Sequence, residues 1–192
     1  VPMFERIRPY LGEDKMNLLR ETIRRIILEA CKRDRYWGFA AAGTVVICSE
    51  DSSIYLHQRP SGTWAYPGGG LHVGYEKYYR TPIPEELRVD PNDPRLFELA
   101  IEELEEEAGY LGLPKYRLLD GFVTYEDCGF IYKTFIVGVS LDEKLKWTPQ
   151  PAPEHGWEVL DDGWFSKDEW QKKDLHHGFT PLLIEKIKGY IQ

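Results

Sequence analysis

Residues 100–109 of this 192-residue chain read AIEELEEEAG. At about 100° per residue, Glu103, Glu106 and Glu107 share one narrow face of a helix, because they are three and four positions apart. Apolar residues form the neighbouring face, which we expect to pack on a sheet; they are Phe97, Ala100, Ile101, Leu104 and Ala108. The segment therefore predicts an amphipathic helix with a row of carboxylates along one side.

Carboxylates on adjacent helical turns repel one another, which destabilises a helix by roughly 0.2–0.5 kcal/mol per close pair. A divalent cation would offset this repulsion, because carboxylate oxygens are preferred ligands of Mg²⁺ and Mn²⁺. The competing interpretation is a solvated acidic face without a ligand. The helix alone does not separate the two.

A glycine-rich segment precedes this helix and reads WAYPGGG at residues 64–70. Successive glycines cost backbone entropy in a helix or a strand, so we expect neither element at Gly68, Gly69 and Gly70. They suit a sharp bend or the close approach of another group, and a bare glycine carbonyl is a further oxygen ligand. Glu76 adds another carboxylate near this turn.

The rest of the chain shows hydrophobic patterns separated by turn-forming residues. These patterns predict strands over 39–48, 54–58, 118–125, 130–139 and 157–165, helices over 13–34, 94–108 and 181–190, and loops over 77–93 and 146–156. No repeat or linker divides the chain. We therefore expect one α/β domain over 38–192, with a helical extension over 1–37 that packs on it.

Composition limits the function. Lys and Arg number 24 against 32 Asp and Glu, giving a formal charge of −8, which argues against sequence-independent binding of nucleic acid. The 42% hydrophobic content excludes global disorder, and no run approaches the roughly 20 apolar residues of a membrane span. Cys31, Cys48 and Cys128 are odd in number and far apart, so we expect reduced core residues and a cytoplasmic protein.

The two motifs together resemble the Nudix box. The matching pattern is Gly70, five residues, Glu76, a spacer, and then the segment 103–109, which carries the Glu-apolar-x-Glu-Glu-x-Gly order. The similarity spans about residues 38–190. It implies a Nudix-type α/β/α sandwich with a mixed central β-sheet.

Two departures from the family pattern stand out. The spacer from Lys77 to Ile101 holds 25 residues, where the family has about seven, so residues 77–93 form an insertion within the box. Glu102 stands where the family has an arginine that pairs with a carboxylate of the box. The arginines that could reach in from the insertion are Arg80, Arg88 and Arg95.

The resemblance implies a Mg²⁺-dependent or Mn²⁺-dependent hydrolase that cleaves a nucleoside diphosphate linked to another moiety. Nucleotide sugars, ADP-ribose, dinucleoside polyphosphates and nucleoside triphosphates all fit this description. The implied metal ligands are Gly69, Glu103, Glu106 and Glu107, completed by the loop residue Glu154. The general base stays open among Glu103, Glu154 and His155. The candidate substrate-binding residues are Arg59, Trp64, Glu76 and Tyr125.

Two other functions stay open at this point. A catalytically weak nucleotide-binding or sensor module would keep the fold but release no phosphate, and the substitution at Glu102 favours it. An RNA-cap hydrolase would need a basic track, which the acidic chain lacks. We expect a small-molecule nucleotide as the partner, without membrane or nucleic acid, and the sequence leaves a homodimer open.

Overall fold

The computed structural model describes residues 16–23, 38–71, 82–109, 116–150 and 156–191. Within them, seven strands form one sheet: β1 Ala40–Cys48, β2 Ser53–Gln58, β3 Trp64–Ala65, β4 Gly68–Leu71, β5 Arg117–Asp127, β6 Phe130–Gly138 and β7 Asp161–Ser166. The labelled helices are α3 Arg95–Ala108, α4 Leu141–Lys146, α5 Lys167–Trp170 and α6 Pro181–Tyr190. Residues 16–23 are also helical, inside the predicted N-terminal helix. How this helix packs on the domain stays a prediction.

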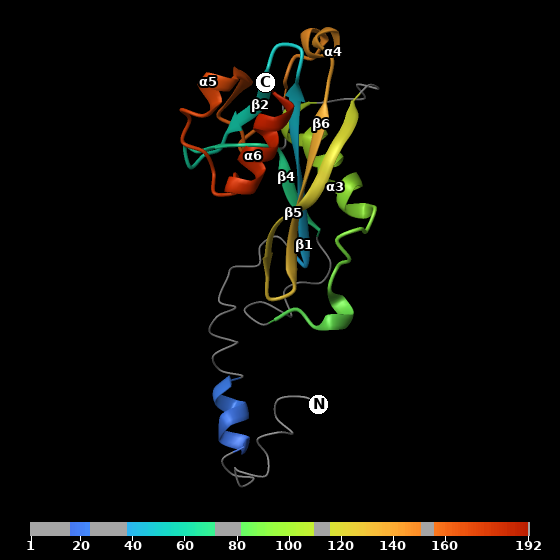
Figure 1. Ribbon diagram of the computed structural model, residues 1–192, viewed down its shortest axis with the longest axis vertical. Coiled ribbons are helices and arrows are strands. Elements are labelled where there is room, and N and C mark those ends of the chain that lie inside the picture. The colour runs from blue at the N-terminus through green and yellow to red at the C-terminus, as the bar shows by residue number, and fades with distance from the viewer. Residues whose placement is uncertain (1–15, 24–37, 72–81, 110–115, 151–155, 192) are drawn as a thin grey trace.

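The sheet is mixed and lies between two helical layers. Its order is β3-β2-β1-β6-β5, with β4 also paired to β1 and β7 to β2. The β1–β6 pair is parallel and the other pairs are antiparallel. Helix α3 covers one face, and α5 and α6 cover the other (Figure 1). The predicted α/β/α sandwich is confirmed.

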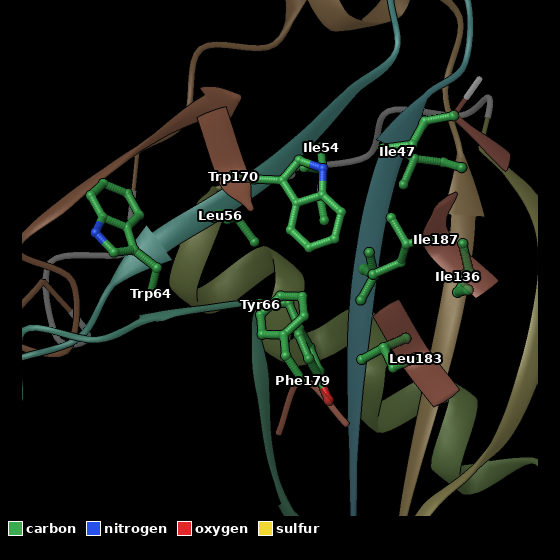
Figure 2. Close-up of a cluster of buried hydrophobic side chains, with 12 residues drawn as sticks. Ile47, Ile54, Leu56, Trp64, Tyr66, Ile136, Trp170, Phe179, Leu183 and Ile187 are labelled. Carbon is green, nitrogen blue, oxygen red and sulfur yellow. The ribbon is translucent and has the colours of Figure 1, made fainter. Parts of the chain in front are cut away.

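The central strand β1 supplies both layers of the core, because successive side chains of a strand point to opposite faces. Val45 and Ile47 pack with α5 and α6, in the cluster drawn in Figure 2. Val46 and Cys48 pack with Leu104 of α3 on the other face. Every residue of β1 is buried, as its nearly continuous apolar sequence predicts.

Local signals define the ends of α3 and hold it on the sheet. The Asp93 carboxylate accepts a hydrogen bond from the Arg95 N–H at 2.9 Å, and Gly109 ends the helix with φ of 62°. The buried Thr44 hydroxyl of β1 donates to the Ala100 carbonyl at 2.9 Å. The predicted helix over 94–108 is confirmed to within one residue, and its carboxylate face has a fixed position relative to β1.

The prediction that the glycine run forms no strand is wrong. Gly68 and Gly69 pair with β1 as part of β4. The predicted close approach is nevertheless present: a Cβ on Gly69 would overlap the Glu103 carboxylate, and one on Gly68 would overlap the Tyr132 hydroxyl. Glycine is thus required at these two positions because another side chain lies where each Cβ would be.

The described part of the insertion packs along the β5–β6 hairpin. Ile83 is fully buried, and its N–H donates to the Cys128 carbonyl at 2.9 Å. Arg88 donates through Nε to the Ile83 carbonyl at 3.2 Å, and Lys133 donates through Nζ to the Pro91 carbonyl at 2.6 Å. The insertion is therefore tied to the strands that follow the helix.

The cysteines differ from the expectation. Cys48 is free and buried, as predicted, but Cys128 is disulfide-bonded. The expectation of three reduced core cysteines is thus wrong for Cys128, and the argument for the cytoplasm that rested on it loses that support. Among the described helices, none has the length and apolar character needed to cross a membrane.

Candidate active site

Glu107 is the buried carboxylate of α3. Its side chain lies where α3 approaches β4, and the residue is 6% exposed. The Gly68 N–H donates a hydrogen bond to Oε2 at 2.9 Å, and Nδ1 of His57 on β2 lies 3.9 Å from the same oxygen. Three elements distant in sequence therefore meet at one carboxylate.

The surroundings of Glu107 disfavour its charged form. The pKa of Glu107 is raised to about 8, first by burial and then by the charges of the carboxylates Glu103 and Glu158. The Gly68 N–H and the charge of Arg59 act in the opposite direction. Glu158 is a carboxylate that the sequence analysis missed; it lies in the turn that precedes β7.

The three carboxylates predicted to share a helix face differ in exposure. Glu107 is buried, Glu103 is half-buried against Gly69, and Glu106 is exposed. The structure therefore brings Glu103 and Glu107 together beside the glycine strand. Glu102 is exposed.

The described arginines of the insertion do not take the place of the family arginine. Arg95 is engaged with Asp93, with Nη2 at 2.6 Å from the carboxylate, and Arg88 is engaged with the Ile83 carbonyl. The cation whose charge acts on Glu107 is Arg59. Arg59 follows directly after β2.

A cavity of about 460 Å³ borders this carboxylate site. Gly68, whose N–H contacts Glu107, is part of its wall. The larger side chains of the wall include Arg59, Tyr66, Tyr125, Phe130, Tyr132, His176 and His177. The cavity thus offers aromatic surface at one part of its wall and basic groups at another, next to the carboxylates.

Two histidines that the sequence analysis did not select, His176 and His177, belong to this wall. The His176 and His177 ring centroids lie 3.8 Å apart, and Nη1 of Arg59 lies 3.4 Å from Nε2 of His176. Burial, followed by the charges of His177 and Arg59, lowers the pKa of His176 to about 4. No local motif marked these residues, because they are more than a hundred positions from Arg59.

A chain of hydrogen-bonded hydroxyl groups connects residues of the cavity wall. The Tyr66 hydroxyl lies 3.0 Å from the Thr134 hydroxyl, which lies 2.8 Å from that of Thr124. Tyr66 and Thr124 both line the cavity. A connected network of this kind fixes side-chain positions, so this part of the wall is preorganised.

The four candidate substrate-binding residues have different positions. Arg59 and Tyr125 line the cavity. Trp64 instead belongs to the buried cluster of Figure 2, with its ring edge-on to Phe165 and Lys173 Nζ 4.0 Å from its centroid. The remaining candidate, Glu76, lies outside the described residues, as do Glu154, His155 and Arg80.

The donor chemistry at the carboxylates suits a hard divalent cation. Within the described residues, no three acidic, histidine or cysteine side chains converge as a complete metal site. The site does gather Glu103 and Glu107 against a glycine strand, and the pKa of Glu107 is raised first by burial and then by the charges of nearby carboxylates, so its charged form lacks compensation there. A cation would supply that compensation, so these residues fit Mg²⁺ or Mn²⁺.

The raised pKa of Glu107 predicts how the stability of the metal-free protein depends on pH. The pKa of Glu107 has its usual value of 4.5 in the unfolded chain and is about 8 in the folded protein, so Glu107 binds its proton more tightly in the folded state. The contribution of this proton to the free energy of unfolding is full below pH 4.5 and is lost as the pH rises through 8. We expect Glu107→Gln to remove this loss and to be more stable than wild type at pH 9 by up to about 5 kcal/mol.

Chemical denaturation in EDTA at a series of pH values measures this difference. His57 and His176, whose pKa values are lowered to about 4, weaken the fold on the acid side, but they do so in both proteins. Equal free energies of unfolding for wild type and variant from pH 5 to 9 would show that Glu107 does not carry the shift.

We compared the sequence and the structure with those of known proteins. No protein-family model matches the sequence, and no curated protein matches it. The structure is similar to an Ap4A hydrolase from C. elegans, with a TM-score of 0.53 and 15% identity over 78% of this chain and 96% of that chain. It also matches a Nudix hydrolase from M. smegmatis, with a TM-score of 0.49 and 19% identity over 80% and 87% of the two chains. The mixed sheet between two helical layers agrees with this likeness, and the chain has the Nudix hydrolase fold.

Proposed function

We propose that this protein is a Mg²⁺-dependent or Mn²⁺-dependent pyrophosphohydrolase whose substrate is a nucleotide seated in the cavity. The observation that carries the proposal is the adjacency of two features. Glu103 and Glu107 lie against β4, and the same strand forms part of the cavity wall through Gly68. Charge for metal binding and a volume for a nucleoside thus occur side by side.

The residues that would hold the cation are Glu103 and Glu107, with Glu106, the Gly69 carbonyl and loop carboxylates completing the set. When bound, the cation would offset the phosphate charge and lower the pKa of a water molecule. Hydrolysis adds this water to a phosphorus atom, breaks the bridging P–O bond and leaves two phosphorylated products. The water proton passes to a carboxylate, for which Glu103, Glu154 and Glu158 are the candidates.

The cavity would bind and orient the substrate. Tyr125 and Phe130, with ring centroids 6.2 Å apart, offer surface for an aromatic base, and Arg59 offers a charge for a phosphate. Arg59 is also the group whose charge acts on Glu107, so a phosphate held there would lie next to the carboxylates. Substrates with more than one phosphate fit this arrangement.

A phosphate-release screen tests the proposal. The compounds are nucleotide sugars, ADP-ribose, dinucleoside polyphosphates and nucleoside triphosphates, each with Mg²⁺ or Mn²⁺. We expect metal-dependent turnover of at least one class. Binding of nucleotide without turnover of any compound would instead support the alternative, a nucleotide sensor, for which the exposed Glu102 in place of arginine is the motivating observation.

Cavity variants test the position of the substrate. We expect Tyr125→Ala and Arg59→Ala each to raise KM about tenfold, because base stacking and a charged hydrogen bond are each worth roughly 1–3 kcal/mol. Arg117→Ala, at an exposed arginine at the start of β5, is the matched control and should leave KM unchanged. If both cavity variants keep the wild-type KM for a turned-over nucleotide, the substrate binds elsewhere.

A further inference from the structure

His57 has a buried nitrogen that the described structure does not satisfy. The residue is 3% exposed, and among the described residues its Nδ1 has no hydrogen-bond partner. Buried polar groups are nearly always paired, so each exception requires an explanation. Here the orphaned nitrogen faces Oε2 of Glu107 at 3.9 Å, about 1 Å beyond a normal hydrogen bond.

The Glu107 carboxylate is held from one side. The Gly68 N–H donates to its Oε2 from β4. The arginine that the family pattern places next to the box glutamates is replaced by the exposed Glu102. Arg88 and Arg95 are engaged elsewhere, as described above. A second donor on the β2 side would fix the orientation of the carboxylate.

We infer that His57 is a positioning residue that donates from Nδ1–H to Oε2 of Glu107 when the site is loaded, leaving the other carboxylate oxygen for the cation. The inference rests on the proposed function, because it assumes that Glu107 is a metal ligand. Such hydrogen bonds are often long in unliganded proteins and tighten in the complex. A shift of about 1 Å in either side chain closes this one.

The strand holds the ring in place for this role. His57 pairs with Ala65 of β3 and with Asp162 of β7, so its backbone is fixed from both sides. Burial, followed by the charges of Arg59 and His176, lowers the pKa of His57 to about 4. The ring is therefore neutral at pH 7 and carries a single proton. Donation of a hydrogen bond to Oε2 of Glu107 requires this proton to be on Nδ1.

Three variants distinguish loss of the Nδ1–H hydrogen-bond donor from loss of the packing of the His57 side chain. In His57→Asn, the side-chain amide nitrogen occupies the position of Nδ1 and restores the donor. His57→Gln places its amide nearer the position of Nε2, and His57→Leu keeps apolar volume without a donor. Thermal unfolding of the metal-free variants shows whether each folds.

Calorimetric titration of the metal-free proteins with Mn²⁺ is the first readout. We expect His57→Leu and His57→Gln to weaken Mn²⁺ binding about 10-fold to 100-fold, the usual effect of removing a group that orients a metal ligand. His57→Asn should stay within about threefold of wild type. Wild-type affinity in a folded His57→Leu or His57→Gln, or equal losses in the Asn and Gln variants, overturns the inference.

Glu107→Gln, titrated in parallel, separates the role of His57 from the assignment of Glu107 as a metal ligand. If it loses Mn²⁺ affinity and the His57 variants do not, only the role of His57 is wrong. If Glu107→Gln binds Mn²⁺ as wild type does, the metal assignment of the proposed function is wrong.

A spectroscopic readout is independent of activity. The ¹⁵N chemical shifts of the His57 ring report which nitrogen carries the proton. We expect a neutral ring protonated at Nδ1, with a further shift when Mg²⁺ is added. A ring protonated at Nε2 would leave a lone pair facing the carboxylate and would overturn the inference.

Discussion

Glu107→Gln is expected to abolish turnover, with kcat reduced at least about 1000-fold, because a divalent cation at such a site contributes several kcal/mol to the transition state. The variant should keep its fold. Glutamine is nearly the same size as glutamate, and its carbonyl oxygen can still accept the Gly68 N–H. Circular dichroism and thermal unfolding check the fold, and steady-state kinetics measures kcat. Glu106→Gln is expected to abolish most activity as well.

The matched control is Glu98→Gln, which neutralises an exposed glutamate in the first turn of the same helix. This change should leave kcat within about twofold, because a solvated charge on that face contacts neither strand nor cavity. Turnover retained in Glu107→Gln or Glu106→Gln would remove the corresponding carboxylate from the metal site.

Substitution of the glycine strand is the second large effect, and two neighbouring positions should respond differently. In Gly68→Ala, the new Cβ would lie 2.8 Å from the Ala42 carbonyl oxygen and from the Gly43 Cα, and it would overlap the Tyr132 hydroxyl. Backbone atoms inside a sheet cannot move away, so we expect a loss of about 2–3 kcal/mol in the free energy of unfolding.

In Gly69→Ala, the atoms nearest the new Cβ belong to the Glu103 carboxylate. This flexible group can turn aside, so the loss of stability should be small. Turnover should nevertheless fall about 100-fold, the typical cost of misplacing a reacting group by about 1 Å. Urea denaturation and kcat of both variants test the contrast. A Gly68→Ala protein as stable as wild type, or a fully active Gly69→Ala protein, would show that the close approach has no consequence.

The parts of the fold that the sequence predicts correctly depend on local signals. Helix α3 begins after Asp93 and ends at Gly109 because a carboxylate cap and a left-handed glycine act within a few residues. The apolar run over 39–48 likewise predicts strand β1. Helix α4 was missed because it has only six residues, although Ser140 caps it by accepting the Glu143 N–H at 3.2 Å.

The errors occur where tertiary contacts override local preference. Glycines disfavour a strand in isolation, yet β4 forms because its backbone pairs with β1, and glycine is required there because Glu103 and Tyr132 lie where Cβ atoms would be. Trp64 has the right chemistry for stacking on a base, but it fills the core instead. Which of several aromatic residues line a cavity is decided by packing between distant segments.

The site itself was predictable only in part. The spacing of the glutamates predicts one shared face, but not that Glu107 is buried while Glu106 is exposed. That difference arises because neighbouring positions point about 100° apart around the helix, and Glu107 is the one at the Gly68 N–H. His57 and His176 reach the site through strand pairing and a distant loop, so no spacing rule could have found them.

The most direct test of the account is the dependence of turnover on Mg²⁺ for the best substrate of the screen, measured after EDTA treatment in wild type and Glu107→Gln. The account predicts no product in EDTA, saturable recovery as Mg²⁺ is restored to wild type, and no recovery in the variant at the same concentrations. Turnover by metal-free wild type, or recovery of Glu107→Gln along the wild-type curve, would contradict the assignment of Glu107 to the metal.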